Sequence, residues 1–315
     1  MGADVIGVLN SLHFGIKNND KQSLVEEIEE KVILGVADYG NPLGVPVLGG
    51  ETLYHESYND NCLVNVAALG LICEDEIVHS YVPKQASSEP YDVILFGKST
   101  DQTGFGGASF SSKTLDDEDE EENVGAVQVH DPFLKRVLVE AIKKCLQFVK
   151  EENIEIGFKD LGAGGISCAT SEIAVAGGYG VTIDLDLVNV IDRDLLPEVI
   201  ACSETQERFC MAVPKSYSKK ICDIFNVDFA IPTLYPNAGA YVIGQITQET
   251  NYVIKYKGKE ICNLPVESIT TEVSANRQAA VRDIAKSVSQ TVIHLDLDIK
   301  EICESLIADK LNVSK

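Results

Sequence analysis

The spacing of apolar residues predicts the first elements of the chain. Residues 5–12 form a short apolar run that is typical of a strand. Residues 23–40 have apolar side chains close to helical spacing with acids between them, and the Gly-Asn-Pro sequence at 40–42 predicts the end of that helix. Apolar runs at 45–48 and 64–72 predict two more strands. The last run is apolar at residues 64–69 except for Asn65, so we expect both of its faces to be covered.

The later part of the chain alternates between strand and helix patterns. The expected strands lie at residues 93–96, 154–158, 181–187, 208–213, 239–246 and 252–256, of which the last two are expected to pair as a closing hairpin. The expected helices lie at residues 132–151, 166–176, 195–201 and 215–225. These patterns divide the chain into a first domain at 1–85, an α/β domain at 86–265 and a mostly helical tail at 266–315.

Composition narrows the class of protein. The net charge of −23 and the lack of a basic stripe that could neutralise phosphates lead us to expect no nucleic-acid partner. No stretch approaches the roughly 18 apolar residues of a membrane span, and the start of the chain has no basic region of a secretory signal. Nine cysteines without a C-x-x-C pair indicate reduced thiols and a cytoplasmic location. An acidic run at 116–122 is more typical of a solvated loop than of a metal site.

Asp160 stands at the end of a predicted strand and opens a glycine-rich turn, residues 161–165, into a predicted helix. In open α/β sheets, ligands bind at the carboxyl ends of strands, and glycines let the backbone approach an anion at a helix N-terminus. An ordinary strand–helix turn, with Asp160 capping the helix, is the alternative interpretation of the same residues.

A second polar cluster, at residues 203–208, lies between a predicted helix and a predicted strand and reads Ser-Glu-Thr-Gln-Glu-Arg. Its carboxylates, amide, hydroxyls and guanidinium can hold a polar ligand by directed hydrogen bonds. A solvated loop with an internal ion pair from Arg208 to Glu204 or Glu207 is the alternative.

Two further candidate segments lie before the helix expected at 132–151. Gln128 precedes this helix, for which Asp131 is the expected N-cap. Gly106 and Gly107 lie in a Gly-x-Gly-Gly turn that lacks the Gly-Lys-Ser/Thr of a P-loop, so the turn is a candidate phosphate nest for a nucleotide only by its glycines.

Together these motifs resemble, in order and spacing, those of the phosphoribosylformylglycinamidine synthases. The segments that carry the resemblance are Asp38-Tyr39-Gly40-Asn41, Val47-Leu48-Gly49-Gly50-Glu51, Leu63-Val64-Asn65-Val66, Val127-Gln128-Val129, Asp160-Leu161-Gly162-Ala163-Gly164-Gly165 and Glu204-Thr205-Gln206-Glu207-Arg208. The resemblance covers nearly the whole chain. It implies an α+β / α/β two-domain half of the aminoimidazole-ribonucleotide-synthetase-like type, with a barrel-forming N-terminal domain and an α/β C-terminal domain.

The resemblance also implies an activity. It is that of an ATP-dependent carbon–nitrogen ligase of purine biosynthesis, which converts formylglycinamide ribonucleotide to its amidine with glutamine-derived ammonia. ATP and Mg²⁺ are the implied cofactors. Gln128, Glu204, Thr205 and Gln206 take the places of substrate-binding residues, with Thr205 where the family has serine, and Asp160 takes the place of a magnesium-binding aspartate.

The implied partners are a glutaminase subunit, a small accessory subunit and a second synthetase half or a homodimer mate. The family's catalytic histidine matches a position before Met1, so we expect no catalytic residue within this chain. A non-catalytic truncated module, or a scaffold that completes its site with another chain, is one alternative function. A related synthetase or kinase of the same fold with another substrate is a second, which Gln128 and residues 204–206 argue against.

From these matches we predict that the isolated chain binds nucleotide or ribonucleotide weakly and shows no synthetase turnover. The physical reason is that phosphoryl transfer needs several charges positioned together. Ammonia-dependent ATP hydrolysis by the purified chain, measured with and without formylglycinamide ribonucleotide, checks this. Hydrolysis stimulated by the ribonucleotide would overturn the prediction.

Overall fold

The computed structural model describes residues 2–17, 22–110, 127–270 and 300. The chain divides into two compact units, a smaller one containing Val5–Gly70 and a larger one containing Met1–Asp4 and Leu71–Thr271. The acidic run at 116–122 and most of the predicted helical tail lie outside the described residues. No described helix is long and apolar enough to cross a membrane.

The smaller unit is a three-stranded sheet with one long helix. Its elements are β1 (Asp4–Phe14), α1 (Gln22–Leu43), β2 (Val47–Tyr54), the short helix η1 (Glu56–Tyr58) and β3 (Leu63–Leu71). The strand order is β2-β1-β3, and β1 and β2 are parallel. Its core joins Leu12 and Phe14 of β1 to Val25 of α1. The helix passes the stop predicted at Gly40 and ends before Gly44, whose φ of +69° is the left-handed conformation of a helix C-cap.

The sheet of the smaller unit exposes much of its apolar surface in this chain. Every residue of β3 is exposed, and so is nearly all of β2. The prediction that both faces of the run at 64–72 are covered is therefore wrong for the chain by itself. The most exposed apolar side chains of the two strands include Val47, Leu48, Val66 and Leu71. A continuous apolar pattern shows that a strand is suited to burial, but it does not show which molecule supplies the cover.

The larger unit is built on a seven-stranded sheet in the order β10-β9-β6-β8-β4-β7-β5. Its strands are β4 (Tyr91–Gly97), β5 (Gly157–Asp160), β6 (Gly180–Asp184), β7 (Arg208–Pro214), β8 (Gly239–Thr247), β9 (Asn251–Tyr256) and β10 (Lys259–Pro265). Its helices are α2 (Gly107–Phe110), α4 (Pro132–Glu151), α5 (Gly165–Gly177), α6 (Pro197–Cys202), α7 (Lys215–Asp223), α8 (Ile231–Leu234) and α9 (Glu267–Thr270). It also has the 3₁₀ turns η2 (Glu74–Glu76), η3 (Lys84–Ser87) and η4 (Leu185–Leu187) and the short π-helix η5 (Ile224–Asp228). Neighbouring strands are antiparallel except β6 and β9, which are parallel.

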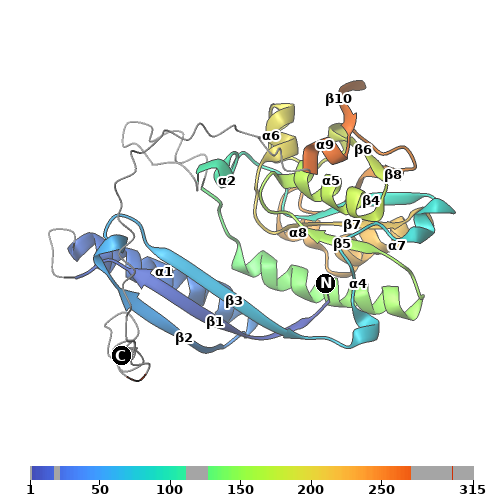
Figure 1. The fold of residues 1–315 in the computed structure, drawn as a ribbon. Coiled ribbons are helices and arrows are strands. Elements are labelled where there is room, and N and C mark those ends of the chain that lie inside the picture. Colours follow the sequence, from blue (N-terminus) through green and yellow to red (C-terminus); the bar gives the residue numbers. More distant parts are fainter. Residues whose placement is uncertain (1, 18–21, 111–126, 271–299, 301–315) are drawn as a thin grey trace, which may run out of the picture. The chain divides into compact units, whose positions relative to one another are not determined.

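Helices cover both faces of this sheet, and the strand β4, which lies between β8 and β7, is buried along its whole length. Ile94 and Phe96 of β4 pack with α4 and α7 on one face. Val93 and Leu95, which point to the other face, pack with α5 and α6. Figure 1 shows α4 on one side of the strands and α5 on the other. The continuous apolar run in β4 is thus explained by cover on both sides.

The predicted hairpin of the last two strands is wrong. Strand β6 lies between β8 and β9, so β9 pairs with β6 in parallel and with β10 in a true hairpin. Lys257 and Gly258, both at positive φ, form the turn of that hairpin. The link from β8 to β9 passes over Gly180, where an added Cβ would lie 1.9 Å from the carbonyl oxygen of Glu249. The short separation of β8 and β9 along the chain suggested that they pair, but β6 lies between them in the sheet.

The segment that follows β3 folds with the larger unit, although the sequence patterns placed it in the first domain up to residue 85. Val82 and Ala86 pack with Tyr91 and Ile173. The backbone N–H of Val82 also donates to the carbonyl oxygen of Ile173 at 3.0 Å. The contacts with Ile173 join residues distant in sequence, which local patterns do not reveal.

Candidate functional site

Three strand ends of the larger unit meet at one edge of the sheet. Strand β7 is antiparallel to both β4 and β5, so its first residue lies beside their last residues. Gly97 is paired with Arg208, and Asp160 with Phe209. The turn after β4, the turn after β5 and the loop before β7 are therefore neighbours. Sequence patterns had singled out each of these segments, and the fold brings them together.

Two glycines let the backbone segments of this edge approach closely. Gly97 has a φ of +124°, and a Cβ there would lie 2.0 Å from the carbonyl oxygen of Glu207. Gly165 has a φ of +54°, and a Cβ there would lie 2.2 Å from the carbonyl oxygen of Ser203. No other residue type fits either position without moving the loop at 203–207.

Arg208 is the buried centre of this edge. Its side chain is only 2% exposed. The guanidinium donates hydrogen bonds to the carbonyl oxygens of Thr205 at 3.0 Å and Ser203 at 2.6 Å, and to the hydroxyl of Thr100 at 2.7 Å. Burial lowers the pKa of Arg208 to about 10, and the nearby charge of Asp101 opposes that shift. The side chain therefore stays a cation at neutral pH, and it holds the loop by two directed bonds and the turn after β4 by a third.

The loop at 203–208 is not a solvated turn, because all of its side chains except that of Gln206 are buried. Glu207, at a φ of +61°, binds Lys135 at 3.0 Å and accepts from the backbone N–H of Asp131 at 3.4 Å. Asp131 caps α4 as predicted, accepting from the backbone N–H of Leu134. The loop is thus tied to the start of α4.

Thr205 faces the glycine-rich turn after β4. Its hydroxyl is fully buried and donates to the carboxylate of Asp101 at 3.0 Å. Burial raises the pKa of Asp101, but hydrogen bonds from Thr103 and Thr205 and the charge of Lys98 outweigh it, so the pKa lies below its usual range. Thr205 therefore connects the loop to the turn.

Gln128, Glu204 and Gln206 form a chain of hydrogen bonds. Glu204 accepts from the side-chain amide of Gln128 at 2.6 Å and from the backbone N–H of Ala108 at 3.0 Å. Gln206 donates from its amide to the side-chain oxygen of Gln128. Glu204 is only 5% exposed, whereas Gln128 is exposed and Gln206 is half-buried. Three of the four predicted substrate-binding residues are thus connected by hydrogen bonds, with Gln128 between the other two.

Asp160 is an exposed carboxylate at the end of β5. The neighbouring Lys159 pairs with Glu172 at 2.6 Å. Among the described residues, no three His, Cys, Asp or Glu side chains gather as a metal cluster. In the glycine turn, the N–H of Gly107 donates to the carbonyl oxygen of Gly104. The roles of Asp160 and of the glycines at 106 and 107 stay predictions.

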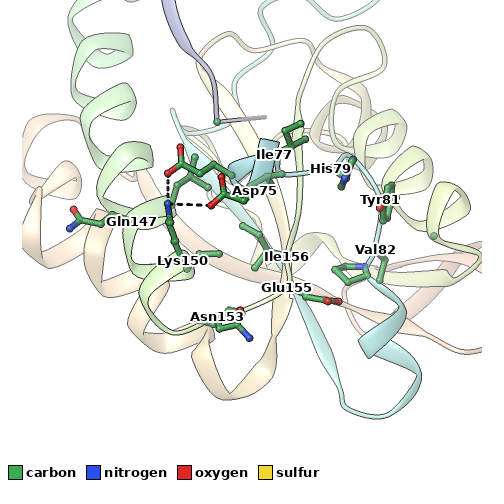
Figure 2. Close-up of a pocket in the computed structure, with 18 of the residues that line it drawn as sticks. Asp75, Ile77, His79, Tyr81, Val82, Gln147, Lys150, Asn153, Glu155 and Ile156 are labelled. Carbon is green, nitrogen blue, oxygen red and sulfur yellow. Dashed lines mark hydrogen bonds and ion pairs between the residues drawn. The ribbon is translucent and has the colours of Figure 1, made fainter. Parts of the chain in front are cut away.

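A hollow of about 970 Å³ in the larger unit lies away from this edge. Its lining comes mainly from residues 75–84, the second half of α4 and residues 153–156. Lys150 forms ion pairs with Asp75 and Glu76 in this hollow. Figure 2 shows Lys150 directed at Asp75. None of the predicted site residues, all of which belong to the described ranges, lines this hollow.

Two domain families match the chain. AIR synthase related protein, N-terminal domain, matches residues 1–72, and AIR synthase related protein, C-terminal domain, matches residues 89–257. Phosphoribosylformylglycinamidine synthase subunit PurL of Methanothrix thermoacetophila is 44% identical over 277 residues, which are 88% of this chain and 36% of that protein. The chain thus spans little more than a third of the length of this curated relative.

Solved structures of Thermotoga maritima PurL are similar to this chain. The complex with FGAR has a TM-score of 0.71 at 30% identity, covering 91% of this chain and 43% of that one. The complex with ATP has a TM-score of 0.67 at 27% identity, covering 90% and 40%. The PurLQS structure has a TM-score of 0.66 at 27% identity, covering 91% and 42%. The resemblance and the two-domain fold expected from the sequence are confirmed.

The three-bond fork of Arg208 yields a stability prediction. Arg208→Lys keeps the charge but cannot reproduce the planar fork, so we expect the free energy of unfolding of the larger unit to fall by about 2–4 kcal/mol. Urea unfolding followed by circular dichroism measures the loss. The matched control is Arg193→Lys on an exposed loop, for which a change within about 0.5 kcal/mol is expected. Equal losses in the two variants would contradict the role of the fork.

Proposed function

This chain belongs to the AIR synthase related family, and we propose that it forms part of a synthetase that converts formylglycinamide ribonucleotide (FGAR) to its amidine in purine biosynthesis. The proposal covers the substrate, the cofactors and the partners, because the chain matches only part of its relatives' length.

The observation that carries this proposal is the pair of accessible amides at Gln128 and Gln206, backed by Glu204. FGAR has a formamide, a second amide and a ribose, all of which exchange directed hydrogen bonds with side-chain amides. A similar protein, T. maritima PurL, binds FGAR in its solved complex. The amide pair at the meeting point of three strand ends is the proposed contact surface for this substrate.

ATP is the proposed energy source, and the related T. maritima protein has been solved with ATP. Asp160 is the proposed Mg²⁺ ligand. Its exposed carboxylate provides one hard oxygen, and Mg²⁺ is commonly held by one or two carboxylates, with nucleotide phosphates and water completing the shell. The donor set therefore fits Mg²⁺ that arrives with a nucleotide. When bound, this ion neutralises phosphate charge.

The proposed partners follow from the same resemblance. They are a glutaminase subunit that supplies ammonia and a small accessory subunit, and the T. maritima relative has been solved as the assembly PurLQS. A second synthetase half or a homodimer mate is the proposed cover for the exposed apolar sheet of β2 and β3. The proposed location is the cytoplasm.

We predict that the 315-residue chain binds FGAR, and that Gln206→Ala or Gln128→Ala weakens binding about 5- to 10-fold through loss of a neutral hydrogen bond. Isothermal titration calorimetry gives the dissociation constants. Gln147→Ala, which removes an exposed amide of α4, is the matched control and should not alter binding. Failure of the unaltered chain to bind FGAR would contradict the proposed substrate.

We also predict that Mg²⁺ strengthens ATP binding by the chain and that Asp160→Asn removes most of this effect, on the order of tenfold, because an amide is a weaker ligand for Mg²⁺ than a carboxylate. Titrations of ATP with and without Mg²⁺ measure it. The control Asp228→Asn removes another exposed carboxylate of the larger unit. If ATP binding depends equally on Mg²⁺ in the Asp160 variant and in the unaltered chain, Asp160 is not the Mg²⁺ ligand.

A further inference from the structure

The predicted substrate-binding triplet divides into buried and accessible members. Glu204 is 5% exposed and Thr205 is fully buried, and both have their polar atoms bonded within the protein. Gln206 is half-buried, and Gln128 beside it is exposed. A ligand that approaches this edge therefore reaches the two glutamines before it reaches the carboxylate.

The carboxylate nevertheless fixes how the glutamines point. A carboxylate carries no proton and can only accept, so the end of Gln128 that faces Glu204 has to be its NH₂ group. The oxygen of Gln128 then faces Gln206, which has to donate a hydrogen bond to it from its own NH₂ group. The two orientations follow from one charge, without any freedom to flip either amide separately.

The end of this chain of bonds is an acceptor. With its NH₂ group turned to Gln128, the amide of Gln206 has its Oε1 atom left over. Among the residues that the structure describes, no protein group donates to that oxygen. At the other end of this row of hydrogen bonds, Glu204 accepts from the backbone N–H of Ala108. This N–H remains a donor when the side chain at position 204 is changed.

We propose that Glu204 is a positioning residue, which sets the polarity of the Gln128–Gln206 relay so that Gln206 offers an oxygen acceptor to an N–H or O–H donor of the ligand. This inference rests on the proposed function, since FGAR is the ligand used to test it. It separates Glu204, which acts through the relay, from Gln128 and Gln206, which contact the ligand.

The relay predicts an inversion in Glu204→Gln. The N–H of Ala108 still needs an acceptor, so the new amide turns its oxygen to Ala108 and its NH₂ group to Gln128. Gln128 then presents its oxygen inward and its NH₂ group to Gln206, whose own NH₂ group is left facing the ligand. The group that Gln206 presents to the ligand therefore changes from an acceptor to a donor, and no hydrogen bond within the relay is lost.

A second substitution restores the acceptor only in the inverted relay. In Gln206→Glu alone, the carboxylate faces the oxygen of Gln128, and two acceptors repel. In the double variant, Glu204→Gln with Gln206→Glu, Gln128 donates to the new carboxylate, which keeps an oxygen for the ligand. Each single variant should therefore be defective and the double variant rescued, an outcome that a role in packing alone does not produce.

The experiment is FGAR titration calorimetry on the 315-residue chain and these three variants. Each single substitution should weaken binding on the order of 30-fold, because Glu204→Gln turns a donor toward the donor of the ligand and Gln206→Glu sets a carboxylate against the oxygen of Gln128. The double variant should bind within about fivefold of the unaltered chain. Glu198→Gln, an exposed carboxylate-to-amide change, is the control and should bind as the unaltered chain does. Unchanged binding in Glu204→Gln, or additive losses in the double variant, would overturn the relay.

Neutron diffraction on ligand-free crystals of the chain, after exchange of its hydrogens for deuterium, tests the orientation of the amides independently of FGAR binding. Deuterium on the Gln128 nitrogen should point at Glu204 in the unaltered chain and at Gln206 in Glu204→Gln. The opposite orientation in the unaltered chain refutes the relay even if FGAR binds. Failure to bind FGAR with the expected orientations refutes the proposed substrate and leaves the relay supported.

Discussion

The fork of hydrogen bonds from Arg208 is the interaction on which the candidate site depends. A buried guanidinium is costly unless its donors are satisfied, and here two carbonyls of the loop and one hydroxyl of the adjacent turn satisfy it. The loop can curve around the cation only because Gly97 and Gly165 leave room for its backbone. Charge, hydrogen bonding and close backbone approach thus act on the same few residues.

The features that the sequence predicted well are those with local physical causes. The bounds of α4 match the apolar periodicity, and Asp131 caps that helix because a side-chain oxygen next to Pro132 can accept from the first turn. The buried strand β4 was visible as an apolar run between turn residues. The polar clusters at Asp160 and at residues 203–208 were visible because strand-end turns rich in glycine and polar groups are uncommon in combination.

The features that the sequence did not reveal depend on distant parts of the chain. No local pattern shows that the hydroxyl of Thr205 is used by Asp101, or that Arg208 binds carbonyls instead of lying in a solvated loop. Nor does an apolar run show whether its own chain covers it, as the exposed strand β3 demonstrates. The resemblance to a family supplied the roles of these residues, and the structure supplied the division between buried and accessible members.

The position of β9 has a consequence for the order in which the larger unit can form. Although few residues separate it from β8, β9 completes its pairing on β6, where Val181 lies beside Tyr252. Contacts between such distant positions form late, because the entropy of closing the intervening chain opposes them. A chain still emerging from the ribosome and ending before Asn251 therefore leaves one edge of β6 unpaired, open to another strand until the last hairpin arrives.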